Sequence, residues 1–167
     1  MKDDSAVVRR LCALLFGLPW CFSAAANCDF QTGAFIDKLN DPSSLSELRI
    51  EVPKSGKFNK NFAKIITSSG RIITPEQKKK FRARIYVQYE FGECQYEGTV
   101  RQSGDWKDHV KMGLKPLRSV DVSLREGNVL GAVKFKLLIP ETRGDLNEIL
   151  GPLLLRRLGF IAPETFH

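Results

Sequence analysis

Apolar and polar residues alternate through the middle of the chain, as they do in strands with one buried face. In residues 82–91 Ala, Ile, Val, Tyr and Phe occupy every second position, and Arg, Gln and Glu hold most of the others. This two-residue period places the apolar side chains on one side of a sheet. Gly92-Glu93 suits a two-residue turn, and residues 94–101 continue as a partner strand. The pattern predicts an antiparallel hairpin.

A second hairpin is predicted from residues 120–125 and 133–139, which alternate in the same way around a turn at Gly127-Asn128. Residues 47–52 predict a further short strand, and the polar, basic stretch 54–61 is interpreted as a loop. Thr74, followed by Pro, Glu and Gln, has the pattern of a helix start with a capping box, so a short helix is expected there.

Near the C-terminus the period changes to that of a helix. From Asp145 onward apolar residues recur at helical spacing, and Gly159 is placed to end the helix. Pro152 lies inside it and is expected to introduce a kink. The apolar positions of this helix are Leu146, Ile149, Leu150, Leu153, Leu154 and Leu158. We expect this apolar stripe to cover one face of the sheet.

These elements predict an α+β domain, mostly an antiparallel sheet of two hairpins covered by one C-terminal amphipathic helix. Residues 27–81 would form an N-terminal extension with a short strand and a helix, and residues 82–167 the sheet and its helix. Residues 160–166 have the pattern of another extended segment, with no turn or partner strand after it. We therefore expect the chain to be a fragment of a longer protein.

The first 26 residues have the pattern of a secretory signal peptide. Arg9 and Arg10 precede an apolar run, and Ser23 and three alanines supply small residues for cleavage after Ala26. The alternative is a retained membrane anchor, but the apolar run is shorter than the roughly 20 residues that a spanning helix needs. The sequence therefore predicts an exported protein in the periplasm, on the cell surface or outside the cell.

Cleavage would leave Cys28 and Cys94 as the remaining cysteines. In an oxidising compartment two cysteines favour one disulfide, with two free buried thiols as the alternative. The leader carries three basic and two acidic side chains, so its removal changes the net charge from +7 to +6. A basic surface suits an acidic polysaccharide or an envelope protein as partner, and no pattern typical of nucleic-acid binding is present. No metal site is expected.

Residues 100–166 resemble the N-terminal lobe of the CotH-type family, the spore-coat protein H family of kinase-like proteins. Residues 101–106, Arg-Gln-Ser-Gly-Asp-Trp, resemble the family's Arg-Gly-Asn-Ser-Ser-Trp stretch, Lys134 and Lys136 lie where the family has a basic strand, and residues 155–163 resemble its helix end. Residues 103–109 and 135–143 are also similar to large exported bacterial proteins that carry such a domain. Gln102 departs from the family pattern, which has Gly there.

The resemblance implies a nucleotide-binding lobe in which Lys134 or Lys136 contacts phosphates and pairs with Glu148, near Ser103 and Gly104. ATP and magnesium would be cofactors only under this interpretation. The family's catalytic and metal-binding acids lie in a C-terminal lobe that the chain does not contain, so the fragment should be catalytically silent alone. The alternative is that both lysines lie on the solvated face of a strand and that Glu148 completes a helix cap.

Residues 103–109 also suggest a sugar site, in which Trp106 stacks on a ring beside Asp105, Asp108 and His109; the alternative is a buried Trp106 in a solvated loop. The two Asp residues do not make a convincing glycosidase pair, and His109 and His167, the only histidines, support no catalytic triad. No catalytic residue is assigned. Two hypotheses remain: a silent fragment of an extracytoplasmic kinase-like protein, and a non-catalytic basic β module that binds an acidic polysaccharide or a partner protein.

Overall fold

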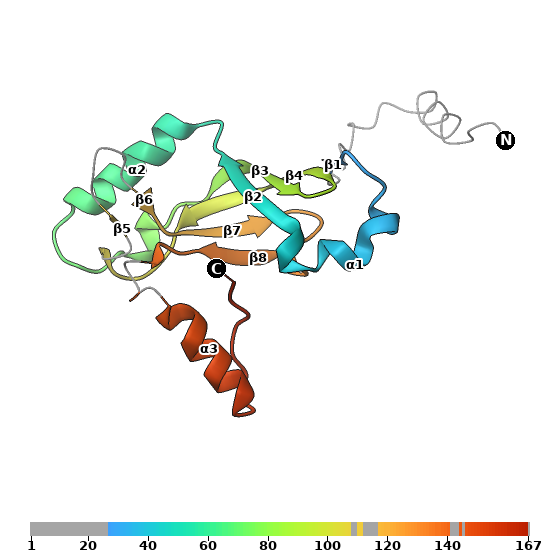
Figure 1. The fold of residues 1–167 in the computed structure, drawn as a ribbon. Helices are drawn as coiled ribbons and strands as arrows, with labels where there is room; N and C mark the ends of the chain where they lie inside the picture. The colour runs from blue at the N-terminus through green and yellow to red at the C-terminus, as the bar shows by residue number, and fades with distance from the viewer. Residues whose placement is uncertain (1–26, 108–109, 112–116, 141–143, 145, 167) are drawn as a thin grey trace, which may run out of the picture.

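The computed structural model describes residues 27–107, 110–111, 117–140, 144 and 146–166. The predicted leader, Asp108 and His109 lie outside the described residues. The chain has an α+β fold with a curled antiparallel sheet (Figure 1). The strands are β1 Asn27–Cys28, β2 Leu45–Glu51, β3 Phe81–Tyr89, β4 Gly92–Gln102, β5 Val110–Lys111, β6 Leu117–Arg118, β7 Val120–Leu124 and β8 Lys134–Leu137. The helices are α1 Ile36–Leu39, α2 Ser55–Thr67 and α3 Asn147–Arg157, and short 3-10 turns cover Thr32–Phe35, Pro42–Ser44 and Pro75–Gln77.

The main sheet has the strand order β2-β3-β4-β7-β8, and β1 adds to β4. Both predicted hairpins form, and the strand predicted at residues 47–52 is the edge strand β2. Residues 27–81 therefore contribute β1 and β2 to the same sheet that residues 82–137 form. The remaining pair, β5 and β6, makes a small separate ribbon.

The two faces of the sheet differ sharply. One face carries the buried apolar side chains of β3, β4 and β7, among them Ile85, Val87 and Val122. Cys28, Phe30 and Leu39 from the N-terminal segment and Phe58 from α2 pack against this face. The opposite face carries the polar half of the alternation, such as Arg101 opposite Asp121. The sequence period thus decides which side of the sheet faces the core.

The first turn differs by two residues from the prediction. Tyr89 pairs with Gly92, so Glu90 and Phe91 form the turn and β4 begins at Gly92. The ring of Phe91 lies 4.8 Å from that of Phe30 and 5.4 Å from that of Tyr89, measured between centroids. Phe91 is therefore a turn residue and not the last residue of the predicted strand. Its ring packs against other aromatic rings at the end of the core.

The predicted loop at residues 54–61 is wrong, because α2 occupies Ser55–Thr67. Phe62 and Ile65 are buried, and the guanidinium carbon of Arg118 lies 4.1 Å from the ring centroid of Phe58 and 4.4 Å from that of Phe62. Arg118 also donates to Asn59 at 2.6 Å, and burial lowers its pKa. The apolar residues at positions 58, 62, 65 and 66 are spaced by four, three and one residues, as on one face of a helix. The many basic residues of this stretch hide that period.

The short helix start predicted at Thr74 is confirmed as a 3-10 turn. The capping box is present, and the backbone N–H of Thr74 donates to Oε1 of Gln77 at 2.9 Å. Gln77 is held in place from the other side because Asn61 of α2 donates to its carbonyl oxygen at 2.9 Å. The turn therefore joins α2 to the start of β3.

Helix α3 forms where the leucine stripe predicts a helix, but the expectation that it covers the sheet is wrong. Leu150 is 55% exposed and Leu154 is 59% exposed, and none of the described α3 side chains is buried. Figure 1 shows α3 extending away from the sheet on the β8 side. The core-facing side of the sheet is largely packed by α2 and the N-terminal segment, and the other face offers charged side chains, so no continuous apolar face is left for α3.

The predicted disulfide is confirmed between Cys28 and Cys94, which face each other where β1 pairs with β4. The backbone N–H of Asp29 donates to the carbonyl oxygen of Glu93 at 3.0 Å, and that of Glu93 donates to Oδ2 of Asp29 at 3.2 Å. These contacts attach the N-terminal segment to the middle of the sheet. Within the described ranges, no helix has the length and apolar character needed to cross a membrane.

Candidate anion-binding site on the polar sheet face

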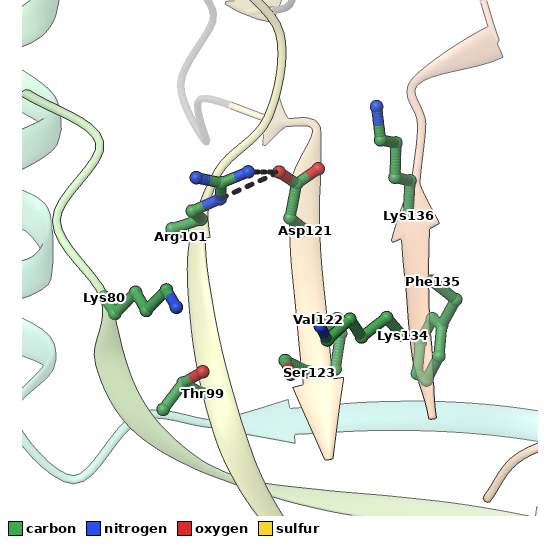
Figure 2. Close-up of a pocket in the computed structure, with 9 residues that line it drawn as sticks. All are labelled: Lys80, Thr99, Arg101, Asp121, Val122, Ser123, Lys134, Phe135 and Lys136. Atoms are coloured by element: carbon green, nitrogen blue, oxygen red, sulfur yellow. Dashed lines mark hydrogen bonds and ion pairs between the residues drawn. The ribbon is translucent and has the colours of Figure 1, made fainter. Parts of the chain in front are cut away.

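A depression of about 310 Å³ lies on the polar face, where β4, β7 and β8 run side by side. We call it the cationic depression, because four basic side chains and one carboxylate line it (Figure 2). Its lining residues are Lys80, Thr99, Arg101, Asp121, Val122, Ser123, Lys134, Phe135 and Lys136. Like charges are therefore concentrated on a surface that solvent and a ligand can reach.

Strand alternation places these groups. Thr99 and Arg101 are two residues apart on β4, as are Asp121 and Ser123 on β7 and Lys134 and Lys136 on β8. The register pairs Arg101 with Asp121 and Asp121 with Lys136, while Ser123 lies between Thr99 and Lys134. Two polar rows thus cross the strands, one with the carboxylate at its centre and one with hydroxyl groups.

Arg101 and Asp121 form an ion pair across β4 and β7. Nε and Nη2 of Arg101 each lie 2.9 Å from Oδ2 of Asp121. The other carboxylate oxygen, Oδ1, is buried and has no hydrogen-bond partner among the described residues. A buried acceptor without a donor costs free energy, about 1–3 kcal/mol in typical cases. Oδ1 is not exposed to solvent, so a ligand reaches it only if the neighbouring side chains move.

Two lysines approach the centre of the depression from opposite sides. In Figure 2 Lys80, just before β3, extends toward β4, and Lys134 extends from β8 toward Ser123. The ammonium group of Lys136 points away from them, toward the far end of the depression. The cations are spread along the face, so the arrangement can hold several anionic groups of one ligand.

The structure brings together two of the predicted nucleotide-binding residues, Lys134 and Lys136. Ser103 and Gly104 lie beyond the end of β4, and Ser103 is buried, with its backbone N–H donating to the carbonyl of Ser119 at 3.0 Å. Glu148 lies in the first turn of α3 and does not line the depression. Lys80, Arg101 and Asp121 were not predicted as binding residues. The pairing of β4 with β7 brings Arg101 and Asp121 together, and the sequence alone does not reveal that pairing.

The Trp106 loop forms a separate surface. Trp106 is 52% exposed, so the alternative of a buried Trp106 is wrong. It bridges to Ile72, and the backbone N–H of Ile73 donates to the carbonyl of Asp105 at 2.8 Å. The side chain of Asp105 forms an ion pair with Lys78. These contacts attach the loop to the segment after α2, and none of the loop's residues lines the cationic depression.

Nothing in the described part of the chain gathers three or more His, Cys, Asp or Glu side chains into a possible metal site. A search of protein-family models, of curated proteins and of solved structures finds no match to the chain.

Proposed function

We propose that the chain is an exported, non-catalytic β module that binds acidic polysaccharide through the cationic depression. The observation that carries the proposal is the gathering of four basic side chains on one open sheet face, with a single carboxylate among them. The four are Lys80, Arg101, Lys134 and Lys136. Such a charge arrangement attracts anionic ligands over a range of about 10 Å at moderate salt.

The polar groups between the cations favour a sugar polymer over a simple anion. Thr99 and Ser123 offer hydroxyl groups that can donate to and accept from sugar hydroxyls. A polysaccharide with carboxylate or sulfate groups supplies anions for the lysines and hydroxyl groups for Thr99 and Ser123. Bare polyanions lack those hydroxyl groups and would make the charge contacts alone.

The disulfide supports the exported location in the proposal. Disulfides persist in oxidising compartments and are rare in the cytosol, where thiols are kept reduced. The Cys28–Cys94 bond holds the first residues after the expected cleavage site onto β4. Measuring the N-terminal residue of the protein recovered from the envelope or medium tests this, and recovery of uncleaved chain in the cytosol would contradict it.

The test of binding compares polygalacturonate with two controls by isothermal titration calorimetry. Dextran has hydroxyl groups without charge, and polyglutamate has charge without sugar hydroxyls. We expect affinity in the order polygalacturonate, polyglutamate, dextran, and salt should weaken the binding of the two charged polymers. Equal affinity for dextran and polygalacturonate would refute recognition of charge, and equal affinity for polyglutamate and polygalacturonate would refute recognition of hydroxyls.

A matched pair of variants locates the binding. Lys134→Gln combined with Arg101→Gln removes two cations from the depression, and Lys60→Gln combined with Lys64→Gln removes two exposed cations from α2. If the depression binds the polymer, the first pair lowers affinity by about a hundredfold or more, since two charge-assisted contacts contribute about 1.5–3 kcal/mol each. Similar losses from both pairs would show that only net charge matters.

A second candidate function is nucleotide binding, which the resemblance to CotH-type kinase-like proteins implies. The position of Lys134 and Lys136 in one depression favours it. Under this proposal the chain is a nucleotide-binding lobe, silent alone, of a protein that transfers phosphate outside the cytoplasm. Equilibrium dialysis with ATP and magnesium tests it. Absence of binding at millimolar ATP would remove this function for the chain, while polymer binding would remain.

A further inference from the structure

The outer edge of β8 is open. Among the described residues β8 pairs with β7 alone. The backbone N–H of Leu124 donates to the carbonyl oxygen of Val133 at 2.9 Å, so by the antiparallel alternation Val133, Phe135 and Leu137 direct their backbone groups toward β7. Lys134 and Lys136 therefore direct their N–H and C=O groups outward, where another strand could pair with them.

Exposed apolar side chains surround this edge. Val133 is 55% exposed and Leu137 is 36% exposed, although both lie on the core-facing side of the alternation. Figure 1 shows α3 beyond β8, and Leu150 and Leu154 of α3 are more than half exposed. An open backbone edge next to unpartnered apolar side chains is typical of a surface that another chain covers.

We propose that the β8 edge binds an extended segment of a partner protein in which acidic and apolar residues alternate. The segment adds a strand to the sheet, with main-chain hydrogen bonds to Lys134 and Lys136. Its acidic side chains lie on the polar face beside those two ammonium groups, and its apolar side chains lie on the other face beside Leu137, with α3 able to pack against them.

Charge selects this occupant over a second copy of the chain. Pairing β8 with β8 of another molecule would place lysines next to lysines on one face, which is unfavourable. The other sheet edge does not offer an equivalent site, because β2 has a register shift between Leu45 and Glu47 and carries Glu47 and Glu51. Irregular edges of this kind resist strand addition. This inference goes beyond polymer binding, although both use the two lysines of β8.

The test uses the full chain and a fluorescent peptide of alternating Asp and Val residues. A control peptide has the same composition with Asp and Val in separate blocks. We expect the alternating peptide to raise fluorescence anisotropy at lower protein concentration than the block peptide does. On binding, the amide protons of Lys134 and Lys136 should exchange more slowly with solvent. Equal binding of the two peptides, or unchanged exchange at both amides, would overturn the proposal.

Lys136→Pro and Lys136→Gln separate backbone pairing from charge. Both remove the ammonium group, but only Pro removes the outward N–H, and Pro is tolerated at a strand edge where that N–H faces solvent. We expect Lys136→Pro to weaken peptide binding about five- to tenfold more than Lys136→Gln does. Lys134→Pro against Lys134→Gln is the second pair should the first Pro variant fail to fold. Equal effects in a folded pair would refute strand addition.

Two further sets of variants test the contribution of α3 and separate peptide binding from polymer binding. Replacing Leu150 and Leu154 with Ser should weaken peptide binding without lowering thermal stability, because both side chains are exposed. Arg101→Gln on the interior strand β4 should weaken polygalacturonate binding and leave peptide binding unchanged, so failure of one proposal is distinguishable from failure of the other. Concentration-dependent dimerisation that Lys136→Pro abolishes would identify a second copy as the occupant and overturn the proposal.

Discussion

Removing the disulfide between Cys28 and Cys94 should lower the free energy of unfolding by an amount that follows from the length of the loop it closes. Cys28→Ala removes the bond while leaving Cys94, whose side chain is fully buried, in place. The experiment is cleanest in a background where Cys12 and Cys21 are replaced with Ser, so that no other cysteine can pair with Cys94. The variant tests how strongly the N-terminal segment depends on its covalent link to β4.

The magnitude follows from the length of the closed loop. The two cysteines are separated by 66 residues. In the chain-entropy model a loop of that length corresponds to about 4 kcal/mol of stabilisation at room temperature. The loop includes β2, α2 and β3 and ends in β4, so breaking it restores freedom to the unfolded form of about half the described residues. A loss of this size should lower the midpoint of thermal unfolding by roughly 10 to 15 °C.

The assay is denaturant unfolding followed by circular dichroism, with and without a reducing agent. The parent should lose about 4 kcal/mol on reduction, and Cys28→Ala should start from the lower stability and be unaffected by the reductant. A difference below about 1 kcal/mol between parent and variant would refute the loop argument. A further loss in the reduced variant would show that the reductant acts on something other than this bond.

Two other predictions concern packing and pH. Gly98→Ala should destabilise by about 1–3 kcal/mol in denaturant unfolding, because an added Cβ would lie 2.5 Å from the carbonyl oxygen of Ser123, whereas Gly56→Ala, with no atom within 4 Å, should not destabilise. Burial raises the pKa values of Tyr89 and Tyr96. Their neutral forms thus stabilise the fold below pH about 10, and unfolding measured from pH 9 to 12 should show this stabilisation being lost as pH rises; a flat profile would contradict the assignment.

Some of this protein could be predicted from the order of its residues. The alternation in residues 82–101 and 120–139 predicts β3, β4, β7 and β8 and assigns apolar side chains to one face, because side chains in a strand alternate strictly between faces. The two cysteines outside the expected leader similarly predict the Cys28–Cys94 disulfide. These are local or pairwise properties, and they do not depend on how strands are ordered.

Tertiary structure alone decided the rest. The cationic depression exists because β7 pairs with β4, which brings Asp121 next to Arg101 and sets the polar face of the predicted β7–β8 hairpin beside that of β4. The exposure of α3 has the same kind of cause. A leucine stripe specifies that a helix needs an apolar partner, but which surface remains free to supply one depends on what α2 and the N-terminal segment have already covered.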